Sequence, residues 1–276
     1  VAPAHNPPYI AAMRAFAEKL PGVPQVAAFE TGFHQTIPPA RQTYAIPYEW
    51  TELGVRRYGF HGASHRYIAT RMAEIAPGAR KLISCHLGGS SSISAIRDGA
   101  SMANSFGMTA QSGLPHAARV GDFDTFALLK LHKAGIDDET IWRRLSKEGG
   151  LLGISGVSQD VRDIKQAADD GHERARLALD VLVESVRGYI GAYLAVLNGA
   201  DAVCFTGGIG QHNPDLRAAM LADMDYAGIA VDLQKNEAAS GHEETRIDGD
   251  GSRAQVWVLP TNEELIVARQ TVAALQ

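Results

Sequence analysis

The sequence predicts an α/β protein built on a mixed sheet. Short apolar runs of strand length alternate with longer segments of helical periodicity, which is typical of a sheet covered by helices. Two of these runs, 81–87 and 92–97, are separated only by Gly88-Gly89-Ser90-Ser91, so they predict a hairpin and an antiparallel pair within the sheet. The 276 residues, 45% of them hydrophobic and 21% charged, suffice for one large domain or two of ordinary size.

The first half of the chain is expected to contain two helices, a short strand and a long loop. A helix over 7–20 is stopped by Pro21-Gly22, and the apolar run 26–29 predicts a strand. A second helix is expected over 66–75. Residues 101–124 are rich in Gly, Ser, Met and Ala and have poor periodicity, so they predict a long functional loop.

The second half continues the alternation of helices and strands. Thr261 and Glu264 form a capping box, which predicts the start of a final helix. The elements expected before it are helices at 126–133 and 138–147, a short helix capped by Ser158, a long amphipathic helix ending at Leu197, a strand at 201–205, a tight turn at 206–210, a helix at 214–223 and a strand at 254–259.

Composition and charge narrow the class of protein. The formal net charge is -5 and no run of Lys or Arg stands out, so nucleic acid is not an expected partner. No apolar stretch has membrane-spanning length, because charged residues interrupt the longest candidate, 177–197. Cys85 and Cys204 each lie in an apolar run, as expected for buried free thiols in a reducing cytoplasm. The chain opens with Val1 rather than Met, which indicates a removed segment or a longer polypeptide.

The segment 56–65, Arg-Arg-Tyr-Gly-Phe-His-Gly-Ala-Ser-His, concentrates groups that bind anions. Its guanidinium and imidazole groups surround glycines at a turn, where they can hold an anionic reacting group. His61 and His65 are four residues apart, a spacing that also suits two zinc ligands on one helix face. The sequence supplies neither a third ligand nor a general base at the expected spacing. A metal hydrolase is therefore a distant alternative to a role in the transition state or in the fold.

Three further charged residues have both a functional and a structural interpretation. Arg119 lies in a glycine-flanked loop, where it suits either a clamp on a transferring phosphoryl group or a surface ion pair. Glu30 ends the apolar run 26–29, and Glu263 begins the last expected helix. Either carboxylate suits Mg²⁺ binding through water, and each also has a purely structural interpretation, which for Glu263 is stabilisation of the helix dipole.

Two glycine-rich turns suit phosphate groups. Residues 86–92 would expose backbone N–H groups and hydroxyls, although the segment also fits a plain hairpin turn and lacks the Gly-Lys-Ser/Thr of a P-loop. Residues 205–210 lie between a strand and a helix, a layout that brings a nucleotide to a helix N-terminus. The glycine spacing there is not the dinucleotide-binding fingerprint, and by itself such a turn is weak support for a ligand site.

Taken together and in order, these segments resemble the acetate kinase family, which comprises acetate, propionate and butyrate kinases. The resemblance extends over essentially the whole chain. The matching segments are 5–7 (His-Asn-Pro), 29–34, 57–65 (Arg-Tyr-Gly-Phe-His-Gly-Ala-Ser-His), 86–90, 150–158, 160–162, 205–210 and 260–264.

The resemblance implies an actin-like, sugar-kinase-like ATPase fold, ribonuclease H-like, with two lobes around a cleft and one lobe incomplete here. Residues 1–30 and 264–276 would be the remnant of the amino-terminal lobe, and 31–263 the carboxy-terminal lobe for nucleotide binding and dimerisation. The implied reaction is the reversible, Mg²⁺-dependent transfer of the γ-phosphoryl group of ATP to acetate or another short-chain carboxylate, giving an acyl phosphate and ADP. The implied enzyme is a cytoplasmic homodimer.

The resemblance also implies roles for individual residues. His61 and Arg119 would stabilise the transferring phosphoryl group, Glu30 would occupy the catalytic carboxylate position, and Glu263 would serve the Mg²⁺ site. The residues implied to hold ATP or ADP are His86, Leu87, Gly88, Gly89, Ser90, Asp160, Val161, Arg162, Gly208, Ile209, Gly210, Gln211 and His212.

The chain departs from the family pattern at several points. Glu30 stands where the family has Asp, Gly89-Ser90 where it has Asn-Gly, and Gln211-His212 where it has Glu-Asn. The extra methylene of Glu30 shifts its carboxylate, and a displacement of about 1 Å can cost on the order of a hundredfold in rate. The family's amino-terminal phosphate turn, a Lys and a substrate-binding Arg would precede this chain. A second hypothesis is therefore an impaired homologue that binds nucleotide or dimerises without turnover.

Overall fold

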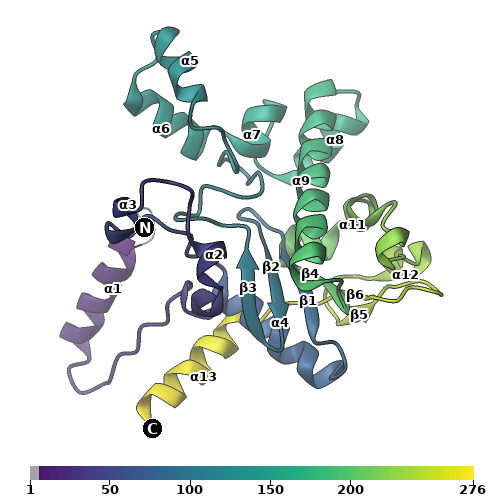
Figure 1. Cartoon of the computed structure of the whole chain (residues 1–276), viewed down its shortest axis with the longest axis horizontal. Helices are drawn as coiled ribbons and strands as arrows, with labels where there is room; N and C mark the ends of the chain where they lie inside the picture. The colour runs from purple at the N-terminus through teal and green to yellow at the C-terminus, as the bar shows by residue number, and fades with distance from the viewer. Residues whose placement is uncertain (1–5) are drawn as a thin grey trace.

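The computed structural model describes residues 6–276, and a six-stranded mixed sheet forms its centre (Figure 1). The strand order is β3-β2-β1-β4-β6-β5. β1, β4 and β6 run parallel, while β2, β3 and β5 each pair antiparallel with a neighbour. The strands are β1 (Lys81–His86), β2 (Ser92–Arg97), β3 (Ala100–Asn104), β4 (Ala202–Thr206), β5 (Thr245–Arg246) and β6 (Gln255–Val258).

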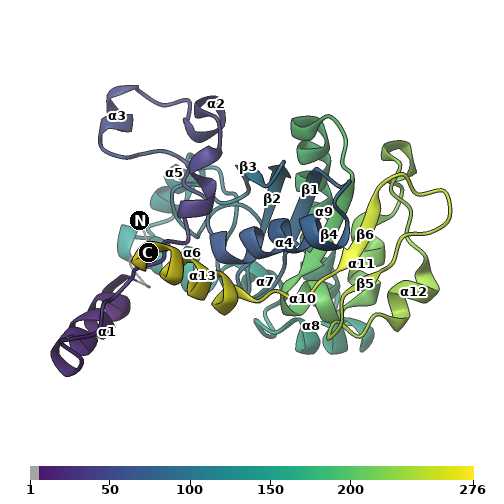
Figure 2. The same cartoon turned by 90° about the horizontal axis from the view of Figure 1, so that it is seen from below.

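Helices cover both faces of this sheet. The α-helices are α1 (Asn6–Lys19), α2 (Pro39–Gln42), α3 (Glu49–Glu52), α4 (Gly62–Ile75), α5 (Ala127–Lys133), α6 (Asp138–Lys147), α7 (Gly150–Ser155), α8 (Val161–Asp169), α9 (Glu173–Leu197), α10 (Gly207–His212), α11 (Pro214–Leu221), α12 (Leu233–Ala238) and α13 (Glu263–Leu275). Short 3₁₀ helices occupy Gly32–Thr36 and Asp225–Ala227. Figure 2 shows α4 and α13 on one side of the sheet and α9 on the other.

Strand alternation divides the core into two clusters. Ile83 and Cys85 of β1 pack in the cluster with α9, whereas Leu82 packs in the cluster with α4. Successive side chains of a strand point to opposite faces, so Ser84 and His86 share the α4 face with Leu82. This polar patch lies where β1 approaches its carboxyl end, facing the start of α4. Both cysteines are buried and free, as the sequence predicts.

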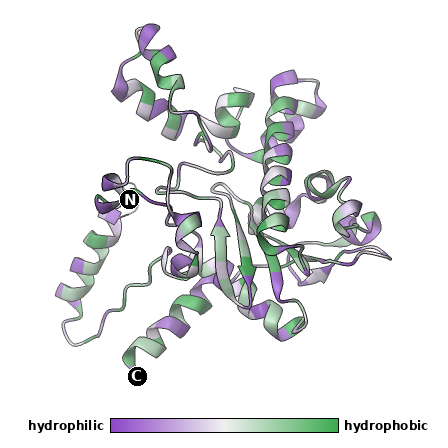
Figure 3. Cartoon of the chain, in the orientation of Figure 1, coloured by the Kyte–Doolittle hydropathy of each residue, from purple (hydrophilic) through white to green (hydrophobic). Residues whose placement is uncertain are grey.

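Two outlying parts of the chain carry exposed apolar side chains. α1 has no buried residue, and its exposed side chains include Tyr9, Met13 and Phe16. α5 and α6 stand off from the rest of the molecule (Figure 1), and Figure 3 shows apolar stretches on them and on α1. Within residues 6–276, no helix has both the length and the apolar character needed to cross a membrane.

The structure differs from three of the expected elements: the strand at 26–29 and the turn at 206–210 are wrong, and the loop from 101 onward is shorter than expected. Residues 26–29 form no strand, because no neighbouring strand accepts their backbone hydrogen bonds and the segment is mostly exposed. The segment expected as loop from 101 onward begins as β3, since its backbone pairs with β2 despite polar side chains. The expected turn at 206–210 is a helix, α10, that starts directly after β4.

The expected caps of two helices are also wrong. Asp160, not Ser158, caps α8 by accepting from the Arg162 amide at 2.9 Å. The Ser158 hydroxyl instead contacts Asp163 at 2.8 Å. Asn262, not Thr261, caps α13 by accepting from the Leu265 amide at 2.9 Å. In both cases a competing side chain one or two residues further along has the better position for the first free amide groups.

Candidate functional site

The start of α4 is a tightly constrained turn. His61, which precedes α4, has φ +55°, a left-handed conformation that residues other than glycine seldom adopt. The backbone passes so close to Glu30 at the next position that a Cβ on Gly62 would lie 2.1 Å from the Glu30 carbonyl oxygen. His61 and Gly62 together therefore set the direction in which the imidazole leaves the chain, toward the carboxyl end of β1.

Several histidines gather around this turn. The rings of His61 and His86 lie 4.2 Å apart between centroids, and His65, one turn further along α4, lies 6.4 Å from His86. Phe106 contacts His61 at 5.3 Å and stacks on His116 at 5.2 Å, so the loop after β3 brings His116 to the same cluster. Residues from α4, β1 and this loop thus form one group of imidazoles.

Burial keeps these imidazoles neutral. It lowers the pKa of His86 to about 4 and that of His116 to about 3, the latter assisted by the charge of Arg119. Burial also lowers the pKa of His61 and His65 well below the usual value, and the neighbouring histidines add to the effect. At neutral pH the cluster therefore contributes neutral N–H groups rather than positive charges.

Arg119 supplies the positive charge that faces this cluster. Its Nη1 donates to the Ala110 carbonyl at 2.6 Å, which ties the guanidinium to the loop. Partial burial lowers its pKa, and its charge lowers the pKa of both His61 and His116. A guanidinium and neutral N–H donors around one space make a suitable environment for an anion with several oxygens.

Glu30 and Glu263 bring two carboxylates together from distant parts of the chain. Loss of hydration raises the pKa of Glu30, although the backbone amides of Ala63 and Gly62 oppose the rise. Burial raises the pKa of Glu263, and the charges of Glu30 and Glu264 raise it further. Two carboxylates that repel each other are a suitable donor set for a divalent cation. In the part of the chain that the structure describes, no three His, Cys, Asp or Glu side chains form a metal cluster.

The two glycine-rich segments lie directly against each other. The Leu87 carbonyl accepts from the amides of Ile209 and Gly210 at 2.8 and 3.2 Å. Gly207 has φ +74°, and a Cβ there would lie 2.6 Å from the Leu87 carbonyl oxygen. The hairpin turn between β1 and β2 and the start of α10 therefore meet at one edge of the sheet.

Four other predicted nucleotide residues, Asp160, Arg162, Gln211 and His212, form polar contacts of their own. Arg162 is exposed and Asp160 half-buried, and the two form an ion pair at 2.5 Å. No hydrogen bond of the described residues joins them to either glycine segment. Gln211 and His212 bond to the carbonyls of Gly241 and Ser240.

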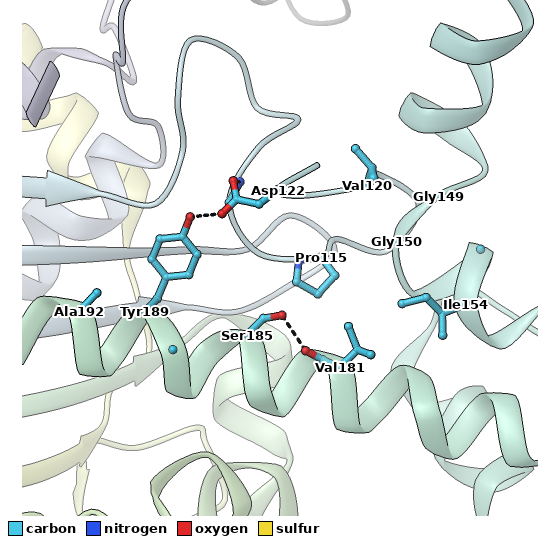
Figure 4. A pocket seen from close by; sticks show the side chains of 13 residues that line it. Pro115, Val120, Asp122, Gly149, Gly150, Ile154, Val181, Ser185, Tyr189 and Ala192 are labelled. Atoms are coloured by element: carbon cyan, nitrogen blue, oxygen red, sulfur yellow. Dashed lines mark hydrogen bonds between the residues drawn. The ribbon is translucent and has the colours of Figure 1, made fainter. Parts of the chain in front are cut away.

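One pocket lies elsewhere, between α9 and the loop that carries Arg119 (Figure 4). It measures about 570 Å³ and is lined mainly by small or apolar side chains, such as Pro115, Val120 and Val181. The Tyr189 hydroxyl donates to Asp122 at one side of it, as Figure 4 shows. None of the predicted site residues lines this pocket, so the chemistry-bearing groups are those of the histidine cluster.

Comparison with known proteins decides the family. The family model described as the acetokinase family matches residues 1–269. The chain belongs to the acetokinase family. An acetate kinase of Desulfitobacterium hafniense is 46% identical over all of this chain and 70% of its own length, and one of Dictyoglomus turgidum is 45% identical over 99% and 68%.

Solved structures of the acetokinase family agree with this assignment. The acetate kinase of Porphyromonas gingivalis superposes with a TM-score of 0.94 at 39% identity, covering 99% of this chain and 70% of its own. A propionate kinase from Francisella tularensis gives 0.91 at 37% identity, covering 97% and 69%. The expected family is confirmed, and the chain has the actin-like, sugar-kinase-like ATPase fold. Of the motif at 5–7, His5 lies outside the described residues.

Tertiary structure brings into the site four residues to which the sequence did not assign individual roles, although Ser64 and Ser92 lie in segments predicted to bind anions. His116 comes from the loop after β3, and Ser64, Ser84 and Ser92 each contact a cluster histidine. A signal for two of these was present, because Ser84 and Ser92 occupy the same strand face as His86 by alternation. His116 lies in the segment 101–124, which the sequence predicted to be a functional loop, but nothing in the pattern distinguished this histidine from the rest of the loop.

Proposed function

We propose that this chain acts as an ATP-dependent kinase of short-chain carboxylates. It transfers the γ-phosphoryl group of ATP reversibly to acetate or a similar acid, giving an acyl phosphate and ADP. The observation that carries the proposal is the convergence of His61, His86 and Arg119 on one space, in a chain of the acetokinase family. The identity of 45–46% over nearly the whole chain does not favour the hypothesis of an impaired homologue.

The chemistry needs positioning and charge stabilisation more than it needs a base. A carboxylate oxygen attacks the γ-phosphorus, the bond to the bridging oxygen breaks, and its electron pair stays on ADP. Because the nucleophile is already an anion, no proton has to be removed. Arg119 and the N–H of His61 are suited to stabilise the equatorial oxygens, on which the charge of the transferring group is spread.

We assign the nucleotide to the edge where the two glycine segments meet. The backbone contact of Leu87 with Ile209 and Gly210 supports this, because it places the hairpin turn and α10 side by side. The residues proposed to hold the nucleotide are His86, Leu87, Gly88, Gly89, Ser90, Asp160, Val161, Arg162, Gly208, Ile209, Gly210, Gln211 and His212.

We assign the divalent metal of the family to Mg²⁺ between Glu30 and Glu263. The mutual repulsion of these carboxylates supports the assignment, because a cation between them relieves it. Mg²⁺ commonly takes one or two carboxylates and completes its shell with water and phosphate oxygens. When bound, it would neutralise charge on the phosphate groups. Glu30 would then lie both at the metal and beside the reacting groups.

We further propose a cytoplasmic homodimer and two lobes. Residues 126–147, which we call the α5–α6 arm, expose two large aromatic side chains: Phe126 is 76% exposed and Trp142 57%. Exposed apolar side chains of this size are typical of a protein–protein contact.

For the lobes, residues 31–263 contain the sheet, and 1–30 and 264–276 would belong to an amino-terminal lobe. The exposed apolar side chains of α1 support that division.

A coupled hydroxamate assay tests the proposed reaction. The full-length gene product is incubated with ATP, Mg²⁺ and acetate, propionate or butyrate, and the acyl phosphate is trapped with hydroxylamine. We expect hydroxamate that depends on ATP and on at least one of the three acids. Nucleotide binding without hydroxamate from any acid would refute the kinase proposal and favour the impaired homologue.

A further inference from the structure

A chain of hydrogen bonds connects His61 to the interior of the sheet. His61 Nδ1 lies 2.9 Å from the Ser92 hydroxyl, which lies 2.8 Å from His65 Nε2. His65 Nδ1 in turn lies 2.9 Å from the Ser84 hydroxyl. Ser84, His65 and Ser92 are all fully buried, so the chain runs from a sealed serine to the proposed catalytic imidazole.

Burial determines which atom donates in each hydrogen bond of this series. Among the described residues, the Ser84 hydroxyl has His65 Nδ1 as its one hydrogen-bond partner. A buried hydroxyl proton without an acceptor costs about 1–3 kcal/mol, so Ser84 donates to His65 Nδ1. His65 is neutral and then carries its proton on Nε2, which donates to Ser92.

The same reasoning reaches His61. Ser92 has one proton and accepts from His65, so it donates to His61 Nδ1. Neutral His61 must then carry its own proton on Nε2. That nitrogen has no hydrogen-bond partner among residues 6–276. It is also not among the fully buried polar atoms that lack a partner, so a ligand can reach it.

Ser64 acts on His86 in the same way. Its buried hydroxyl lies 2.8 Å from His86 Nδ1, its one hydrogen-bond partner in the described part of the chain. His86 is likewise neutral and keeps its proton on Nε2. The rings of His61 and His86, 4.2 Å apart, thus present N–H groups rather than lone pairs to the site.

We propose that Ser84, His65 and Ser92 are positioning residues that lock His61 in its Nε2–H tautomer, so that it donates to an oxygen of the transferring phosphoryl group. The proposal rests on the proposed kinase function for its catalytic part only. In the other tautomer, His61 would turn a lone pair toward an anionic oxygen. A neutral histidine held in the Nε2–H tautomer can donate to the phosphoryl oxygen without first taking up a proton.

The tautomer is measured directly in the unmodified protein. Long-range ¹H–¹⁵N correlation spectra of protein with ¹⁵N-labelled histidine separate protonated from unprotonated ring nitrogens, and loss of a signal in His61→Gln assigns His61. We expect His61 Nε2 to be protonated and Nδ1 unprotonated at neutral pH. The reverse pattern would overturn the proposal whether or not the protein has kinase activity, so its failure is distinct from failure of the proposed reaction.

Variants then test whether the lock matters for the reaction. Ser84→Ala removes the first donor of the hydrogen-bond series, and Ser92→Ala removes the hydroxyl that links His65 to His61. We expect a mixture of His61 tautomers in the spectra and a fall in kcat of roughly tenfold to a hundredfold, with little change in KM for ATP. Ser84→Thr keeps the hydroxyl and should restore the single tautomer.

Ser94→Ala is the matched control. Ser94 is a buried serine on the same face of β2, paired with Ser84 across the hairpin, but its hydroxyl bonds to Ser101 and the Ala103 carbonyl. We expect its loss to change neither the His61 signals nor kcat. Unchanged His61 signals and a kcat within about twofold of the parent in both Ser84→Ala and Ser92→Ala would refute the proposal.

Discussion

At the scale of single residues, burial determines what each side chain can do. The histidines of the cluster are neutral because they are removed from water, so they act as hydrogen-bond donors of fixed orientation. The guanidinium of Arg119 remains charged under the same conditions, because its ordinary pKa is far above neutrality. The candidate site therefore combines one cation with two neutral donors that have no other partner among the described residues, the Nε2–H groups of His61 and His86.

Replacing Arg119 tests the cationic part of the site. In Arg119→Ala we expect kcat for acyl phosphate formation to fall by about a thousandfold, as for other arginines that stabilise a transferring phosphoryl group. Added guanidinium ion should restore part of the rate, because it can occupy the vacated space. Arg71→Ala, which removes an exposed arginine paired with Glu74 and Glu244, serves as control. A loss no greater in Arg119→Ala than in the control would contradict the assignment.

Glu263 and its neighbour Glu264 form a matched pair for testing the metal site. We expect Glu263→Gln to raise the Mg²⁺ concentration for half-maximal rate by about tenfold or more, because one of two carboxylate ligands is lost. Glu264 is exposed, and Glu264→Gln should leave this concentration nearly unchanged. Titration of the rate with Mg²⁺ distinguishes the two variants, and equal curves for both would remove Glu263 from the metal site.

At the scale of elements, the two glycine segments depend on each other's backbone. Gly207 allows β4 to pass into α10 with φ +74° while the chain stays against Leu87. Side chains are excluded there by contact as well as by conformation. The sequence of glycines alone indicated a turn, but the close approach of the hairpin explains why glycine is required at this position.

Gly207→Ala should destabilise the protein, whereas Gly208→Ala should not. In the first variant a Cβ meets the Leu87 carbonyl at 2.6 Å in a left-handed conformation, which we expect to lower the free energy of unfolding by about 1–3 kcal/mol. In the second, nothing lies within 4 Å of the new Cβ, and alanine favours the helix. Urea denaturation of both variants measures the difference, and equal midpoints would show that the hairpin moves aside freely.

At the scale of the whole molecule, neutral buried histidines make stability depend on pH. His34, His86 and His116 have pKa values of about 4, 4 and 3 in the folded protein, against 6.5 for a free histidine. Between about pH 4 and pH 6.5, the unfolded chain therefore binds more protons than the folded one. Stability from these groups is fully present above about pH 6.5 and is lost as the pH falls toward 4.

Urea unfolding at pH 7.5, 6.5, 5.5 and 5.0 tests this dependence. Below pH 6.5 we expect the free energy of unfolding to fall by about 1.4 kcal/mol per pH unit for each such histidine. His116→Gln should show a shallower slope, whatever its stability at pH 7.5. The same free energy at pH 7.5 and 5.0 would mean that these imidazoles take up protons freely in the folded state.

The exposed aromatic residues of the α5–α6 arm, Phe126 and Trp142, are the second property of the whole molecule that can be tested. If it forms the dimer contact, Trp142→Glu should shift the protein from dimer to monomer in size-exclusion chromatography with light scattering, because a charge is costly in an apolar interface. Lys133→Glu changes the charge of the same arm outside its exposed aromatic residues and serves as control. A dimer unaffected by Trp142→Glu would place the contact elsewhere.

Much of the fold was predictable because its signals are local. The hairpin 81–97 followed from two apolar runs and four turn residues, and α9 from its amphipathic length. The strand expected at 26–29 failed because strand formation needs a neighbour that the local sequence does not reveal. β3 escaped prediction for the converse reason, since its partner β2 determines its structure more than its own side chains do.

The sequence by itself determined the family, the fold and the residue types of the site. The motif residues follow one another closely in the chain, so they can be recognised one segment at a time, even where a distant contact such as that of Gly62 with the Glu30 backbone explains the residue. Only the tertiary structure decided which groups meet: Glu30 with Glu263, the hairpin turn with α10, and Ser84 with His65. These contacts depend on long-range packing, and burial then sets the protonation of each group.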